Sequence, residues 1–268
     1  MKRISIHVCT KDRPHELSLL LQSLRQQTFK NWDLVILDEC QQPITSSFVT
    51  HCLLNAIMQE GHCVNIIKND LLLGVCKARN KLLDEDYFNN AAVCRLDDDV
   101  ILEPDYLERL LYVLNDYDIA SGVTPNFQIP PIKRKLSSIG SKVINRKEFN
   151  KQGEITLYGD DCGTMFTESK IMPTHEFRSC ALMKKKVADI MRYETNLSFV
   201  GFREEAFFSL RAQWEHKFKI GVDTGAVVWH FCSPQGGCRF PDYADKVKSD
   251  NDYFYKWAKK MYKKHGDL

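Results

Sequence analysis

Three consecutive aspartates at positions 97–99 are the residues of this sequence with the clearest chemical potential. They follow a short apolar run over residues 91–96 that has the length of a buried strand, and Pro104 suits the first turn of a helix over residues 105–114. Adjacent carboxylates repel one another unless a cation or the donors of a ligand neutralise them, so a divalent ion is their natural partner. The alternative is a solvated turn or a helix-capping cluster, because aspartate is common at such junctions.

The elements that would position these aspartates alternate along the first 123 residues. The sequence predicts strands at 4–10, 33–37, 63–67, 91–96 and 119–123, and helices at 14–27, 49–58, 74–83 and 105–114. This alternation predicts an α/β fold with a doubly wound, mostly parallel sheet flanked by helices. Because the C-terminal ends of parallel strands share one edge, we expect Thr10, Asp38 and the aspartates to converge on a single crevice.

The second half of the chain is less regular. Prolines, glycines and the basic run at 133–135 predict a loop-rich insertion over residues 124–177, where an acidic acceptor would suit the basic run. Strands at 179–183, 219–222 and 226–230 and helices at 185–191, 204–214 and 250–264 follow. The last helix is basic and aromatic; docking on the core is its simplest interpretation, and peripheral contact with a membrane surface is the alternative.

Composition limits the partners and the compartment. The 268 residues, 44% of them apolar, can build one large domain or two fused halves, and 37 basic against 35 acidic residues give no reason to expect nucleic acid. The N-terminal residues are too few and too polar for a signal peptide, and no apolar run approaches a membrane span. The sequence therefore predicts a cytoplasmic protein without a transmembrane segment.

The ten cysteines are scattered singly, so we expect reduced, buried thiols rather than a disulfide framework. His230, Cys232 and Cys238 form the one cluster, which fits structural zinc poorly because such sites usually carry two close pairs of ligands.

Four segments, in this order, resemble the glycosyltransferases of family 2 with the GT-A fold. They are "VCTKDRPHELSLLLQSLRQQTFKNWDLVILDE", "LLLGVCKARNKLLDE", "VCRLDDDVILEPDYLERL" and "VGFREEAFFSLRAQWEHKFKIGVDTGAVVWHF". The resemblance covers residues 3–123 and 178–231 and implies an inverting enzyme that uses a nucleotide sugar. It implies a single compact domain with a nucleotide-sugar-binding half at 1–123, an acceptor-binding and catalytic-base half at 124–245, and the C-terminal helix at 246–268.

The resemblance also implies roles for the matching residues. The nucleotide sugar is expected at Thr10, Asp12, Asp38, Arg79, Asp97 and Asp98. The implied metal ligands are Asp97, Asp99 and His230, with Mn²⁺ or Mg²⁺ as the ion, although a histidine closing an apolar strand is often a packed core residue. Glu205 is the implied general base and Glu204 its neighbour, of which only one can face the reacting carbon.

The sequence departs from the family pattern at positions that concern the nucleotide, the catalytic base and the number of sugars transferred. The position of the catalytic general base holds Glu205 instead of aspartate, one methylene longer. The second strand ends in Asp38-Glu39 instead of the usual Asp-Asp, which makes the pattern less specific for uridine. The Gln-x-x-Arg-Trp signature of processive synthases is missing, so we expect single transfers from a UDP-sugar to a glycan or another hydroxyl acceptor. The loop at 233–240 could place Arg239 on a diphosphate, or it is a plain surface turn.

Two other functions remain open at this stage. A sugar-phosphate nucleotidyltransferase would need a glycine-rich basic loop after the first strand, and residues 10–14 contain no glycine. A non-catalytic nucleotide-sugar- or glycan-binding protein of the same fold would keep the acids without turnover.

Overall fold

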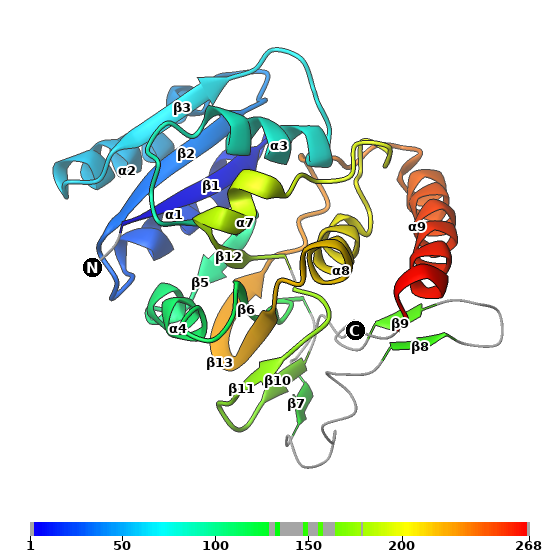
Figure 1. Ribbon diagram of the computed structural model, residues 1–268. Helices are drawn as coiled ribbons and strands as arrows, with labels where there is room; N and C mark the ends of the chain where they lie inside the picture. The colour runs from blue at the N-terminus through cyan, green and yellow to red at the C-terminus, as the bar shows by residue number, and fades with distance from the viewer. Residues whose placement is uncertain are drawn as a thin grey trace.

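The computed structural model describes residues 3–128, 132–134, 147–149, 155–157, 164–177 and 179–266. Its centre is a nine-stranded sheet in the order β11-β13-β6-β12-β4-β1-β2-β3, with β5 paired to β13 (Figure 1). The strands are β1 (Ile4–Thr10), β2 (Trp32–Asp38), β3 (Val64–Lys68), β4 (Ala92–Leu96), β5 (Val100–Leu102), β6 (Ile119–Val123), β11 (Ile171–Pro173), β12 (Ala181–Lys184) and β13 (Ile220–His230). The helices are α1 (Pro14–Arg25), α2 (Phe48–Gln59), α3 (Val75–Glu85), α4 (Tyr106–Val113), α7 (Lys185–Ile190), α8 (Glu204–His216) and α9 (Tyr243–His265).

The sheet is mostly parallel, as the sequence predicts. Strand β1 pairs in parallel with β2 and β4, β2 with β3, and β13 with β6, whereas β12 is antiparallel to both of its neighbours. The register sets Val8 beside Leu96, so the end of β1 lies next to the aspartates that follow β4. The predicted α/β fold is confirmed.

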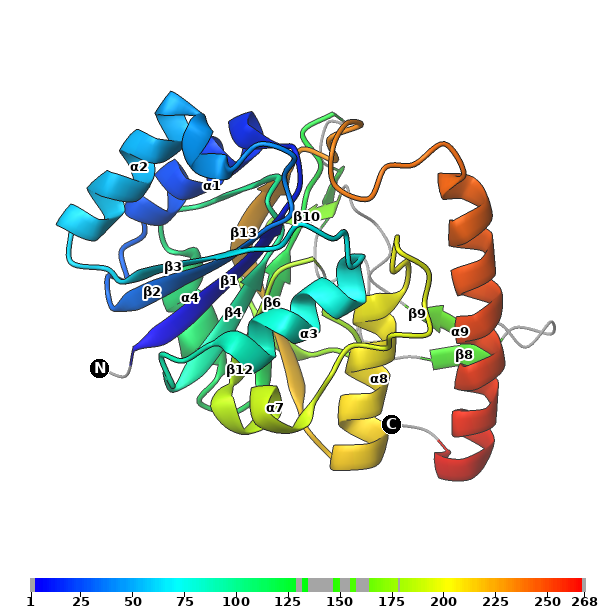
Figure 2. The same ribbon diagram turned by 90° about the horizontal axis from the view of Figure 1, so that it is seen from above.

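Helices cover both faces of the sheet because the strands alternate their apolar side chains (Figure 2). Leu34 and Ile36 of β2 belong to the core that includes α1, α2 and α4. Val35 and Leu37 point the other way, toward α3. Consequently β2 is buried along its whole length, as expected for a parallel strand covered on both sides.

Helix α9 packs outside α8 (Figure 2). The Phe207 ring of α8 contacts the rings of Phe254 and Trp257, with centroids 5.1 and 4.4 Å apart. The helix begins at Tyr243, earlier than the predicted position 250, and its docking on the core confirms the simplest interpretation of the C-terminal pattern. Of the helices in the described ranges, none has the length and hydrophobicity needed to cross a membrane.

One strand was missed and one local prediction is wrong. The helix expected at 105–114 forms as α4, but the short strand β5 lies between the aspartates and this helix. The two strands expected at 219–222 and 226–230 form the single strand β13, whose register to β6 shifts between Val222 and Val227.

Much of the insertion expected after position 124 lies outside the described residues, including Lys135 of the basic run. Within the described part, two strand pairs appear, β7 (Ile132–Arg134) with β10 (Thr164–Phe166) and β8 (Lys147–Phe149) with β9 (Ile155–Leu157).

Candidate active site

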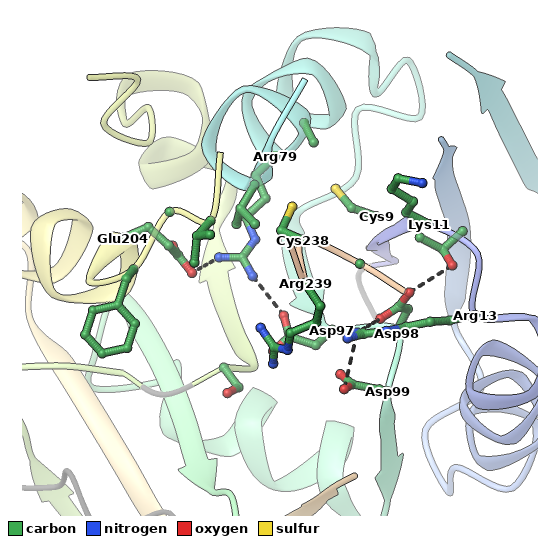
Figure 3. Close-up of a pocket in the computed structure, with 18 of the residues that line it drawn as sticks. Cys9, Lys11, Arg13, Arg79, Asp97, Asp98, Asp99, Glu204, Cys238 and Arg239 are labelled. Carbon is green, nitrogen blue, oxygen red and sulfur yellow. Dashed lines mark hydrogen bonds and ion pairs between the residues drawn. The ribbon is translucent and has the colours of Figure 1, made fainter. Parts of the chain in front are cut away.

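A cavity of about 500 Å³ opens at the C-terminal ends of β1 and β4. Its lining comes from these strand ends, the first turns of α3 and α8, and the segment after β13 (Figure 3). The expected crevice therefore exists, and residues from both halves of the chain share it. Its lining includes Thr10, Arg79, Asp97, Asp98, Asp99, Glu204, Glu205 and His230 among the predicted site residues.

Asp98 is hydrogen-bonded to residues at and just after the end of β1. Its carboxylate accepts hydrogen bonds from the Thr10 hydroxyl at 2.9 Å and from the Arg13 guanidinium at 2.8 Å. Burial raises the pKa of Asp98 to about 6, although Arg13 opposes the shift. The middle aspartate thus fixes the acidic turn to the first strand.

Asp97, Asp99 and His230 form a candidate metal centre. One ligand atom from each lies within 4.8 Å of the others, so the three could hold a single ion. The contacts of the Asp97 carboxylate with Arg79 and Arg95, at 2.8 and 3.2 Å, both use Oδ1. Two carboxylates and one imidazole fit Mn²⁺ or Mg²⁺, which favour oxygen ligands and complete their coordination with phosphate and water.

Asp99 and His230 are in direct contact and form an ion pair when His230 is protonated. His230 Nε2 lies 3.1 Å from Asp99 Oδ1. Burial would raise the pKa of Asp99, but His230, Arg13 and the Ser233 N–H outweigh it and lower that pKa to about 2. Burial likewise opposes the charged His230, whereas Asp99 raises its pKa to about 11.

Strand β5 explains why His230 faces Asp99. It runs antiparallel to the end of β13, with Val100 opposite His230. Beyond this pair, Phe231 N–H donates to the Asp99 carbonyl at 2.9 Å, and Ser233 N–H donates to the Asp99 carboxylate at 3.0 Å. The missed strand therefore joins residues that are more than a hundred positions apart.

Glu204 and Glu205 begin α8 and differ in exposure. The Glu204 side chain is 3% exposed and forms ion pairs with Arg79 and with Arg95, the latter at 3.0 Å. The Glu205 side chain is 23% exposed and lies 3.0 Å from Arg95. Burial would raise the pKa of Glu205, but Arg95 and Arg79 lower it, so this carboxylate is ionised and reachable from the cavity.

Arg79 and Arg95 connect the acids of the two halves. Figure 3 shows Arg79 between Glu204 and Asp97, and Arg95 contacts Asp97 and both glutamates. Sequence reasoning found Arg79 through its motif but missed Arg95, because a charged residue inside an apolar strand has no motif of its own. The buried Arg95 and the half-buried Arg79 allow several carboxylates to stay ionised in one place.

Asp12 and Asp38 are not among the residues that line the cavity. Asp38 is buried and accepts hydrogen bonds from the N–H groups of Cys40 and Ile44 at 3.0 and 3.1 Å. Asp12 accepts one from Gln41 N–H at 2.8 Å. Both carboxylates therefore shape the loop after β2, and the expectation that Asp38 reaches the shared crevice is not met.

Glu39 takes the place at the cavity that was expected for Asp38. Its Oε1 accepts hydrogen bonds from Leu73 N–H at 2.8 Å and from the Asn69 amide at 3.1 Å. Burial raises the pKa of this carboxyl. The Asp38-Glu39 pair is the signal in the sequence, and Glu39 is the member that lines the cavity.

The loop after β13 closes one side of the cavity. Arg13 Nε donates to the Gln235 carbonyl and Gly237 N–H donates to the Lys11 carbonyl, both at 2.8 Å. A side chain at Gly236 or Gly237 would collide with Arg13. Arg239 is exposed at the cavity and stacks over the Tyr243 ring, 4.9 Å from its centroid.

Comparison with known proteins gives consistent results. The family model described as glycosyl transferase family 2 matches residues 5–172. Among solved structures, TarS of S. aureus (residues 1–349) is 14% identical with a TM-score of 0.58, covering 85% of this chain and 60% of that one. GalNAc-T7 with UDP, GalNAc and Mn²⁺ is 12% identical with a TM-score of 0.67, covering 100% of this chain and 55% of that one.

At these identities the solved structures support the fold alone. The chain spans only 60% of the solved TarS fragment and 55% of the solved GalNAc-T7 chain. No curated protein sequence matches the chain significantly.

Proposed function

The chain belongs to glycosyl transferase family 2, and from this premise we propose that it is a metal-dependent, inverting enzyme that transfers a sugar from a UDP-sugar to a hydroxyl acceptor. One observation carries the proposal: Asp97, Asp99 and His230 lie on one side of the same cavity that Glu204 and Glu205 enter from α8. A site for a diphosphate-bound cation and a carboxylate base are the two parts that this reaction requires.

The metal would be held by Asp97, Asp99 and His230. When bound, it supplies positive charge that stabilises the departing nucleoside diphosphate. Arg13 and Arg79 already contact the carboxylates of this group, at 3.2 Å from Asp99 and 2.8 Å from Asp97. These arginines hold the acids in place and limit their mutual repulsion.

Glu205 is the favoured base. Inversion requires a carboxylate that takes the proton of the acceptor hydroxyl while the hydroxyl attacks the face opposite the leaving diphosphate. Glu205 is the more exposed of the two glutamates, whereas Glu204 is enclosed by Arg79 and Arg95. We therefore assign proton transfer to Glu205 and the holding of the two arginines to Glu204.

Glu39 supports a uracil base. Its Oε1 is occupied by Leu73 N–H and the Asn69 amide, which leaves Oε2 as the acceptor for a donor on the base. Uracil offers its N3–H in that role. The solved structures named with UDP and UDP-GlcNAc, which have a similar fold, agree with this assignment.

We assign the donor to residues 1–123 and the acceptor to residues 124–245. Within the range 124–245, the cavity is lined by Arg203, Arg239 and Tyr243, among others. Non-processive transfer rests on the missing Gln-x-x-Arg-Trp signature of the sequence.

Release of free nucleoside diphosphate tests the proposal. The wild type and Asp99→Asn would be incubated with UDP-, GDP- and other nucleotide sugars in Mn²⁺, Mg²⁺ or chelator. We expect slow, metal-dependent hydrolysis of a UDP-sugar that falls at least about a hundredfold in the variant, because an electrostatic group at the leaving phosphate is lost. Binding of UDP without release from any donor, in the presence of any metal, would favour a nucleotide-sugar-binding protein instead.

A further inference from the structure

Helix α9 has two faces of different chemistry. On the inner face, Phe254, Ala258 and Met261 are buried against the core. On the outer face lie five exposed lysines, at positions 256, 259, 260, 263 and 264. Their spacing of three and four residues places them on one side of the helix, along about 12 Å of its axis.

The outer lysines have no acidic partners among the residues that the structure describes. In the first half of α9, Lys246 pairs with Asp242 and Lys248 with Asp252, each at 2.8 Å. After Asp252 the helix contains no acidic residue, and none of the five lysines forms an ion pair with a residue in the described ranges. Lysines at this spacing repel one another, so this half of the helix carries a charge cluster that folding does not require.

The helix dipole explains only part of the cluster. Positive side chains in the last turn, here Lys263 and Lys264, interact favourably with the C-terminal end of the helix. Lys256, Lys259 and Lys260 lie outside that turn, where the effect has decayed. Their shared direction therefore points to a partner of negative charge.

We propose that this lysine face docks the protein on an anionic lipid surface. Clusters of four to eight basic residues on an amphipathic helix are attracted by acidic headgroups. Helix α9 contains no arginine, although arginine is the residue suited to paired recognition of single phosphates or nucleic acid. Tyr253, Trp257 and Tyr262 pack against the protein, the first two on Phe207, so the lysines alone form the contact face.

The attachment is electrostatic, because the apolar face of α9 is already occupied. Phe254 and Ala258 are fully buried, and the Phe207 ring contacts Phe254 in an edge-to-face arrangement on this side. Inserting the helix into lipid would require undocking it from α8. Docking through the lysines leaves the fold and the cavity intact, and it should be reversible and sensitive to salt.

Sedimentation with lipid vesicles tests this directly. The full chain would be mixed with phosphatidylcholine vesicles that contain either no acidic lipid or about a third phosphatidylglycerol, at roughly 0.1 M salt. The triple variant Lys256→Gln, Lys259→Gln, Lys260→Gln keeps the last turn unchanged. Since each lysine contributes about a fivefold gain in partitioning, we expect the variant to bind acidic vesicles about a hundredfold more weakly.

Matched variants separate position from total charge. Lys30→Gln, Lys77→Gln, Lys170→Gln removes three exposed lysines from other elements and should bind as the wild type does. Lysine-to-arginine changes at 256, 259 and 260 should also preserve binding. An equal loss of vesicle binding in both glutamine variants would overturn the proposal. So would a wild-type protein that binds duplex DNA but does not bind acidic vesicles. Binding alone is measured, so the result does not depend on sugar transfer.

Discussion

At the level of single residues, exposure and charge distinguish two neighbouring carboxylates that the sequence could not separate. Glu204 and Glu205 both begin α8, but Arg79 and Arg95 enclose only the first. A group that must exchange a proton with a bound hydroxyl has to be reachable, whereas a group that neutralises buried cations has to be enclosed. The two glutamates should therefore fail in different ways when substituted.

Glu205→Gln should lower kcat by about 10² to 10⁴ with little change in stability, because it removes a proton acceptor at the cavity. Glu204→Gln should instead cost about 3 kcal/mol of unfolding free energy, since it removes the most enclosed of the carboxylates that neutralise Arg79 and Arg95. Steady-state kinetics and urea denaturation of both variants check this. A larger loss of turnover in a stably folded Glu204→Gln would exchange the two roles.

Glu39 should determine the base of the nucleotide. In Glu39→Gln the side-chain oxygen can keep its bonds to Leu73 and Asn69, while the new amide group presents donors where the carboxylate presented an acceptor. We expect UDP affinity to fall about tenfold or more and the preference to move toward CDP, whose base offers an acceptor at N3. Calorimetric titration of both nucleotides measures it, and an unchanged UDP:CDP ratio would remove Glu39 from base recognition.

At the level of elements, α9 holds the segment that carries the proposed base. Asp250 is buried and accepts hydrogen bonds from Ser198 N–H, the Ser198 hydroxyl and Phe202 N–H, at 2.7, 2.8 and 2.9 Å. Arg203 Nε donates to Asn251 of the same helix at 2.9 Å. The segment 198–203 leads directly into Glu204 and Glu205, so the helix positions both glutamates.

Asp250→Ala should cost about 2 to 4 kcal/mol of stability, because three donors lose their acceptor inside the protein. Turnover should fall as well, since the start of α8 loosens. Asp252→Ala is the matched control: it is exposed on the same helix, pairs among the described residues with Lys248 alone, and should change stability by less than about 0.5 kcal/mol. Equal behaviour of the two variants in chemical denaturation would contradict this role of α9.

The sequence predicted those elements whose pattern is local. Residues 14–27 have the apolar spacing of a helix, and α1 forms at Pro14–Arg25. Strand β5 was missed because three residues are too few to show alternation, and its pairing with β13 depends on a partner far along the chain. The same reason hid Arg13 and Arg95, whose importance comes only from the carboxylates that the fold brings to them.

The candidate site also has a part that local patterns predict and a part that depends on the fold. The aspartates, Arg79, the glutamates and His230 reach one cavity because strand ends and helix starts share an edge, which the pattern of the sequence already indicated. Whether Asp38 or Glu39 faces that cavity depends on one turn of the backbone after β2, and alternation alone does not fix such a turn.

At the level of the whole molecule, the site and the stability of the fold are connected through one ion pair. His230 closes β13 and Asp99 follows β4, so their contact joins the last strand to the centre of the sheet. The pKa of Asp99 is lowered to about 2, so its contribution is present above about pH 4 and is lost below that. The pKa of His230 is raised to about 11, so its contribution is present below about pH 6.5 and declines as the pH rises toward 11.

His230→Gln should therefore reduce metal-free stability most between about pH 4 and 6.5. We expect a loss of about 2 kcal/mol at pH 6, falling to about a third of that at pH 9.5, measured by urea denaturation in chelator. His51→Gln, an exposed change on α2, should give a small difference that is the same at both pH values. A loss for His230→Gln that does not shrink at the higher pH would contradict the ion pair, because it would mean that a neutral His230 donates its N–H to the ionised Asp99 carboxylate across the whole pH range.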